Sequence, residues 1–177
     1  MQASRVGPSA AVSPGPMLTQ VSQTFAAAMD SLGLREVATP ASGNCFAMAI
    51  VQGATNKDLA EPTSKLKQLT ATLKTGVKED YASNPSEREA VVADNTWGGN
   101  DVIGLAAMFL RRSIYVLELE DTRANPWSCR QFEPAVLYIR AKSIASFTER
   151  PLDILECLNA IRADIIDSSA PPIVLRY

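Results

Sequence analysis

Ala41-Ser42-Gly43-Asn44-Cys45-Phe46-Ala47-Met48-Ala49-Ile50 is the stretch that decides the fold, because a short polar turn passes directly into an apolar run. The run continues with the spacing i, i+3, i+4, i+7 of one buried helical face, at Phe46, Ala49, Ile50 and Gly53. Cys45 is therefore expected in the first turn of this helix, where free backbone N–H groups and the positive end of the helix dipole stabilise an anion. The thiolate is the nucleophilic form of cysteine, so the pattern indicates a candidate nucleophile at Cys45.

The composition is that of a single globular domain long enough to bury a core: 177 residues, 46% hydrophobic and 20% charged, with a net charge of −2. No run of basic residues is longer than Arg111-Arg112, so a nucleic-acid or anionic-membrane surface is not indicated. The longest uncharged apolar run, from Val102 to Leu110, is too short to span a bilayer. The sequence therefore predicts neither a nucleic-acid partner nor a membrane partner.

The three cysteines and the lack of histidine limit the chemistry. Cys45, Cys129 and Cys157 are an odd number at irregular spacing, which argues against a disulfide framework and for a reducing compartment. The sequence has no CxxC pair and no histidine to complete a zinc site, so we expect no metal and no cofactor. Histidine is also the side chain whose ordinary pKa suits general-base catalysis near neutral pH, and a cysteine hydrolase needs such a base.

Hydrophobic periodicity divides the chain into a tail and one domain. Residues 1–16 are rich in Ser, Ala, Pro and Gly and are expected to form a disordered tail, with the domain at 17–177. Helices are predicted at 18–32 (ended by Gly33), from Thr63 as the cap to Val77, from Asn100 as the cap to Leu110, and from Pro151 to Asp167. Strands are predicted at 34–39, 113–119, 135–140 and 172–177. Helices and strands without strict βαβ alternation indicate the α+β class, with a small central sheet flanked by helices.

Two segments together resemble the ovarian tumour (OTU) family of cysteine proteases, most of which are deubiquitinases. The family's nucleophile signature is Asp-Gly-Asn-Cys, an apolar residue, two variable positions, Ala and a branched apolar residue, and the stretch from Ser42 to Ile50 is similar to it. The second signature is Trp-Gly-Gly opening a helix that a strand follows, and Trp97-Gly98-Gly99 with the helix and strand up to Val116 is similar to that. Pro172 to Leu175 resembles the strand that the family places just before its histidine.

The resemblance implies an OTU-like, papain-type cysteine protease fold. It implies attack by the Cys45 thiolate on the carbonyl at the C-terminal glycine of ubiquitin or a ubiquitin-like protein. The implied supporting residues are Ser42, Gly43 and Asn44 in the oxyanion loop and Trp97, Gly98 and Gly99 as architectural residues near the cleft. The implied location is the cytoplasm, or the cytoplasm of a host if the chain is a secreted effector or viral protease.

The sequence departs from the family pattern at two places. Ser42 stands where the family has Asp, and no histidine follows the last predicted strand, since the sequence stops at Tyr177. Tyrosine and lysine titrate too high, and carboxylates are weak bases, so no other residue replaces the histidine. Three hypotheses follow: a deubiquitinating hydrolase whose sequence stops just short of its histidine, a catalytically inactive OTU-fold module that binds ubiquitin or serves as a scaffold, and an unrelated α+β interaction protein with Cys45 in its core.

Overall fold

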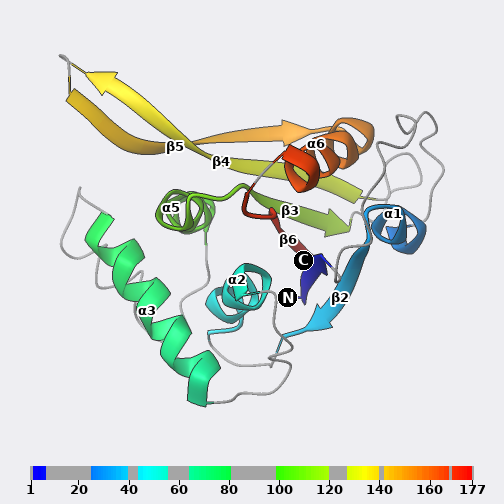
Figure 1. The fold of residues 1–177 in the computed structure, drawn as a ribbon, viewed down its shortest axis with the longest axis horizontal. Helices are drawn as coiled ribbons and strands as arrows, with labels where there is room; N and C mark the ends of the chain where they lie inside the picture. Colours follow the sequence, from blue (N-terminus) through cyan, green and yellow to red (C-terminus); the bar gives the residue numbers. More distant parts are fainter. Residues whose placement is uncertain are drawn as a thin grey trace.

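The computed structural model describes residues 2–6, 25–39, 44–55, 64–80, 99–119, 127–139, 142–167 and 169–176. Within them the helices are α1 (Phe25–Ser31), α2 (Cys45–Thr55), α3 (Ser64–Asp80), α5 (Asn100–Leu110) and α6 (Ile154–Asp167). The strands are β1 (Gln2–Val6), β2 (Leu34–Ala38), β3 (Ile114–Leu119), β4 (Trp127–Ile139), β5 (Lys142–Leu152) and β6 (Ile173–Arg176). The protein has a mixed α/β architecture in which helices flank a small mixed sheet (Figure 1).

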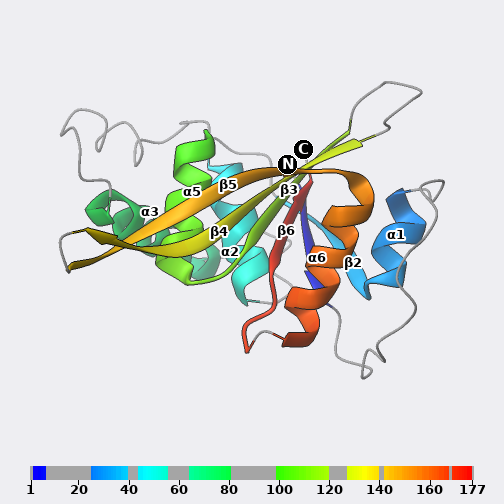
Figure 2. The same ribbon diagram turned by 90° about the horizontal axis from the view of Figure 1, so that it is seen from above.

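The strands of the described residues form one sheet in the order β2-β1-β6-β3-β4-β5. β3 and β6 are parallel, and the other neighbouring pairs are antiparallel. β4 and β5 form a long hairpin, in which Cys129 pairs with Leu152 at one end and Ile139 with Lys142 at the other. This hairpin extends past α5 as a two-stranded ribbon (Figures 1 and 2).

Side chains of the central strands alternate between two cores, one on each face of the sheet. Ile114 and Val116 of β3 pack with α2, α3 and α5, whereas Tyr115 and Leu117 pack with α1 and α6. Because both faces of the sheet are covered, the central strands are apolar at nearly every position. Full burial of one large aliphatic side chain, such as Ile50 at 0% exposure, contributes about 1.5–3 kcal/mol to stability.

β2, α2 and β6 are arranged so that Cys45 lies toward the edge of the sheet that is formed by the carboxyl end of β6, not by an outermost strand. β2 and β6 are both antiparallel to β1, so they point in the same direction. The chain leaves β2 at Ala38, and α2 then runs back, since Gly53 near its end contacts Ile173 at the start of β6. Figure 2 shows α2 beside β6, whose arrowhead lies near the C-terminus of the chain.

Replacing Gly53 by alanine should destabilise the fold, because the new Cβ would lie 2.7 Å from Cγ2 of Ile173. Ile173 is fully buried and cannot move without disturbing the core. Overpacking of this kind costs about 1–3 kcal/mol of unfolding free energy, which urea denaturation measures. In a double-mutant cycle with Ile173→Ala, which removes that Cγ2, the double variant should lose less than the sum of the two single losses. Strictly additive losses would contradict the contact.

The prediction of a disordered tail is wrong for its first residues. Gln2–Val6 form β1, which pairs with β2 on one side and β6 on the other. Amino-acid composition does not predict such a strand, because the strand forms through backbone hydrogen bonds to β2 and β6, which are distant in the sequence. Residues 7–16 lie outside the described residues, as do 18–24 of the predicted helix at 18–32.

The predicted start of the last helix is also wrong. Pro151 lies in β5 opposite Arg130, at the edge of the sheet, where a strand tolerates the missing N–H of proline. α6 instead begins at Ile154, with Asp153 before it. The carboxylate of Asp153 accepts a hydrogen bond from the backbone N–H of Glu156 at 2.8 Å, which caps the helix.

The other corrections concern α5 and the hairpin. Gly99 rather than Asn100 is the N-cap of α5, and no side chain caps the helix. Asn100 is the first helical residue, and its side-chain amide donates to Oε1 of Glu149 in β5 at 2.8 Å. The strand predicted at 135–140 is part of the longer β4, and β5 was not predicted.

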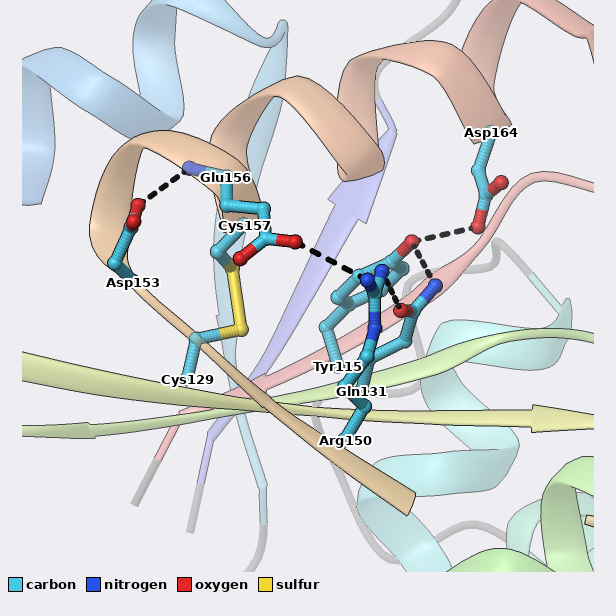
Figure 3. The surroundings of a disulfide bond; sticks show 8 residues. All are labelled: Tyr115, Cys129, Gln131, Arg150, Asp153, Glu156, Cys157 and Asp164. Atoms are coloured by element: carbon cyan, nitrogen blue, oxygen red, sulfur yellow. Dashed lines mark hydrogen bonds and ion pairs between the residues drawn. A yellow bond between two sulfur atoms is a disulfide. The ribbon is translucent and has the colours of Figure 1, made fainter. Parts of the chain in front are cut away.

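The expectation of no disulfide is wrong as well. Cys129 of β4 and Cys157 of α6 are joined, with their Cα atoms 6.3 Å apart (Figure 3). The two residues are 28 positions apart, and only the packing of α6 on the sheet brings them together. A disulfide is typical of oxidising compartments, so this pair weighs against the reducing compartment that the cysteine count favoured.

A chain of hydrogen bonds holds α6 to the sheet beside the disulfide (Figure 3). The hydroxyl of Tyr115 donates to Oδ2 of Asp164 at 2.8 Å and accepts from the Gln131 amide at 3.0 Å. Arg150 donates to Oε1 of Gln131 at 3.0 Å and to Oε1 of Glu156 at 3.1 Å. The buried polar groups of this chain of bonds, on Tyr115 and Gln131, are therefore paired, as burial requires.

Stability should fall as the pH rises above about 10, the ordinary pKa of tyrosine. Burial, and secondarily the hydrogen bond to Asp164, raise the pKa of Tyr115 above the ordinary tyrosine value of 10.0. The folded protein holds the phenol proton more tightly than the unfolded chain, so this stability is complete below pH 10 and is lost above it. Tyr115→Phe should lower the unfolding free energy by about 1–3 kcal/mol at pH 7, because Asp164 and Gln131 lose a partner. The variant should also show a flatter stability profile above pH 10 in urea denaturation, and an unchanged slope would contradict the assignment.

Candidate functional site

Cys45 is the first residue of α2, where the sequence predicts it. The carbonyl of Asn44 accepts the first helical hydrogen bond, from the N–H of Met48 at 3.0 Å. The N–H groups of the first turn have no acceptor within the helix and point toward the end at which Cys45 lies. Cys45 is a free, partly exposed cysteine, whereas the two disulfide cysteines are 1% and 0% exposed. Its position is that of an accessible thiol at the end of a buried helix.

α3 brings a lysine to the same end of α2. Nζ of Lys74 donates to Oδ1 of Asn44 at 2.6 Å, although the two residues are 30 positions apart. Lys74 is half-buried, and its charge has the same sign as the N-terminal end of the helix dipole. Sequence reasoning missed this residue, since no signal distinguishes Lys74 from the other lysines of the same helix.

Gln52 is a second residue that sequence reasoning missed. It is fully buried, and its Nε2 donates to the carbonyl of Ala38 at 3.1 Å. Its Oε1 accepts from the hydroxyl of Thr39 at 2.8 Å. Gln52 therefore connects α2 to the end of β2, from which the chain continues toward Cys45. A polar residue in an otherwise buried, apolar helix was the available signal.

Arg112 fixes the other end of α2 to the segment that leads into β6. One terminal nitrogen of Arg112 donates to the carbonyl of Ala54 at 2.7 Å, and Nε donates to the carbonyl of Pro171 at 2.6 Å. The second terminal nitrogen also bonds Pro171. Burial lowers the pKa of Arg112, but an arginine stays charged at neutral pH. These bonds set the position of α2 relative to β6, and hence of Cys45 relative to the end of that strand.

The other predicted site residues are only partly described. Ser42 and Gly43 of the predicted oxyanion loop, and Trp97 and Gly98 near the predicted cleft, lie outside the described residues, so their roles stay predictions. Gly99 is exposed and extended, with φ −75° and ψ 174°, where it caps α5.

The sequence holds no histidine, so no imidazole of this chain accompanies the thiol as a general base. In the part of the chain that the structure describes, no group of three or more His, Cys, Asp or Glu residues is placed to hold a metal ion. The same residues contain no helix long and apolar enough to cross a bilayer. The site therefore consists of a free thiol and the backbone N–H groups at the start of α2, without an imidazole.

A cavity of about 550 Å³ lies elsewhere, at the turn between α1 and β2. Its lining residues are Met29, Asp30, Gly33, Leu34, Arg35, Glu36 and Arg176. Arg176 pairs with Glu36 there at 2.7 Å, a partly exposed ion pair of the kind that contributes little to stability. α1 packs on the face of the sheet opposite α2, so this cavity is separate from the Cys45 site.

Comparison of the chain with protein-family models, curated proteins and solved structures finds no match. Interpretation of the site therefore depends on its own residues. These place a partly exposed thiol at the start of a buried helix, with a lysine beside the residue that precedes it. The last strand, β6, ends toward the same edge of the sheet.

Proposed function

We propose that this protein is an OTU-like, papain-type cysteine hydrolase that acts on the C-terminal peptide or isopeptide bond of ubiquitin or a ubiquitin-like protein. The observation that carries the proposal is the free, partly exposed thiol of Cys45 at the first residue of α2, directly after Ser42-Gly43-Asn44. A thiol at the first residue of a helix lies near the free backbone N–H groups of the first turn, which are donors of the kind that an oxyanion needs.

The reaction requires a nucleophile, an oxyanion site and a proton acceptor. The Cys45 thiolate attacks the carbonyl carbon of the C-terminal glycine, and backbone N–H groups at the start of α2 hold the developing oxyanion. A general base takes the proton of the Cys45 thiol and gives it to the amine as the C–N bond breaks, and water then hydrolyses the thioester. The 177 residues hold no histidine to carry the proton. Residues that follow β6 in a longer form of the chain would leave the sheet at the edge toward which Cys45 lies.

The lack of histidine favours a second candidate function, a catalytically inactive ubiquitin-binding or scaffold module on the same fold. Binding needs a complementary surface but no proton transfer, so the same face could hold ubiquitin without cleaving it. The two functions differ in turnover, and a base added in solution separates them.

Hydrolysis of ubiquitin carrying a C-terminal aminomethylcoumarin, measured over a series of imidazole concentrations, tests the proposal. Imidazole supplies the missing base, so we expect the rate to rise with imidazole for the wild type and to stay at background for Cys45→Ala. Ubiquitin binding without imidazole-dependent hydrolysis would favour the binding module. Neither binding nor hydrolysis would reject both functions.

A further inference from the structure

We infer that Gln52 is a positioning residue for Cys45: its buried carboxamide fixes the end of β2 against α2 and so anchors the start of the turn that leads to the thiol. The inference rests on the proposed function of Cys45. It goes beyond that function, because it concerns how the end of β2 is held against α2, the helix that begins at Cys45.

The geometry of Gln52 joins three parts of the chain. Its side chain reaches the carbonyl of Ala38 and the hydroxyl of Thr39, at 3.1 Å and 2.8 Å, and it has no exposed surface. Cys45 is seven residues earlier in α2, so the two residues share a face of the helix and are about 10 Å apart along its axis. Gln52 therefore contacts the chain just before the turn, and Cys45 lies just after it.

Both ends of the turn are held by side chains from elsewhere. Only residues 40–43 separate Thr39 from Asn44. Gln52 of α2 bonds Thr39 at one end, and Lys74 of α3 bonds Asn44 at the other. Thr39 and Asn44, the described residues nearest to this segment on either side, are thus each bonded to a helix.

A purely structural explanation of Gln52 is weaker. α2 is buried at every residue from Phe46 to Gly53, and the others in that range are apolar. Burying an amide is unfavourable unless its groups are hydrogen-bonded, and an aliphatic side chain would fill the same space without that requirement. A glutamine at position 52 instead makes directional hydrogen bonds to Ala38 and Thr39 at the end of β2.

The test compares four variants by the rate at which ubiquitin with a C-terminal vinyl sulfone captures Cys45. Gln52→Leu removes both bonds, and Thr39→Val removes one while keeping the shape of the side chain. Thr39→Ser keeps the hydroxyl that bonds Gln52 and should be captured at the wild-type rate. Gln131→Leu is the matched control, because it removes a buried glutamine from the network on the opposite face of the sheet.

We expect capture to slow roughly 10- to 100-fold for Gln52→Leu, the size of effect that a misplaced reacting group produces, with a smaller loss for Thr39→Val. Gln131→Leu should be captured within about twofold of the wild-type rate. This should hold even if its urea midpoint is lowered as much as that of Gln52→Leu, since stability alone does not set the rate of capture. Hydrogen exchange should quicken in peptides covering 38–48 for Gln52→Leu and Thr39→Val only.

The outcomes separate this inference from the proposed function. If the wild type is not captured, the proposed function fails, and hydrogen exchange alone decides whether Gln52 anchors the turn. If the wild type is captured and both Gln52→Leu and Thr39→Val react as fast as Gln131→Leu, the inference is overturned. Should Gln52→Leu fail to fold, the comparison of Thr39→Val with Thr39→Ser still decides, because unequal rates support the inference and equal rates contradict it.

Discussion

Replacing Cys45 by alanine is expected to abolish covalent capture of ubiquitin that carries a C-terminal electrophile. The residue is the one free cysteine of the chain, and it is the first residue of α2, where the helix has N–H groups without an acceptor in the helix. The same change should leave the unfolding free energy within about 1 kcal/mol of the wild type, because the side chain is partly exposed and small. Capture followed by gel electrophoresis and urea denaturation measure the two quantities separately.

Cys45→Ser is the matched control for size, and it should also resist capture because a serine hydroxyl is not ionised at neutral pH. Capture that persists in either variant would mean that another residue reacts. A loss of several kcal/mol in Cys45→Ala would mean instead that the thiol is packed in the core, which supports the hypothesis of an unrelated interaction protein.

Breaking the Cys129–Cys157 disulfide is expected to lower the unfolding free energy by about 3–4 kcal/mol, the chain-entropy value for a loop of this length. The loop spans 28 positions and includes β5, and the bond ties the first turn of α6 to β4. Urea denaturation of the untreated and the dithiothreitol-treated protein measures the difference. Reduction leaves both sulfur atoms in place, so it opens no cavity in the core.

The double variant Cys129→Ala/Cys157→Ala is the control for the effect of the disulfide on stability. Its stability should not respond to dithiothreitol, whereas that of Cys45→Ala should respond as the wild type does. Equal stability of the oxidised and reduced wild type, or free thiols at both positions in the untreated protein, would contradict a stabilising disulfide.

The sequence was sufficient for elements whose own residues carry a strong pattern. The helix that begins at Cys45 has an apolar spacing that survives in the structure, where Phe46, Ala49 and Ile50 are all buried. β3 and β6 are apolar at successive positions because both of their faces are covered. The glycine predicted to end the first helix does adopt a left-handed conformation, with φ +66° at Gly33.

The elements that the sequence did not predict depend on distant partners. β1 is a strand because β2 and β6 pair with it. β5 is a strand because it pairs with β4 along its whole length. Residues 148–151 of β5 are exposed, so no alternation of apolar residues marks this part of the strand. Pro151 suggested the start of a helix because proline suits that position, and only the edge location of β5 explains its place in a strand.

The candidate site was likewise predictable only in part. The motif around Cys45 predicts a thiol at the first residue of a buried helix, because the residues that carry this pattern are consecutive in the chain. Gln52 and Lys74 bond Thr39 and Asn44 because α2, β2 and α3 pack together, and no local pattern encodes that packing. The sequence did not predict the disulfide for the same reason. The odd number of cysteines argued against a disulfide framework, but it does not exclude one pair.

The most direct test is to incubate the non-reduced wild-type protein with ubiquitin vinyl sulfone and to locate the adduct by peptide mass spectrometry. We predict one ubiquitin per chain, attached at Cys45, and complete loss of the adduct after prior alkylation of that thiol. Iodoacetamide is the reference reagent, because it modifies any accessible thiol without recognising ubiquitin. Modification of Cys45 by iodoacetamide with no ubiquitin adduct would contradict the proposed function, since the thiol would then be accessible but would not be presented to the ubiquitin C-terminus.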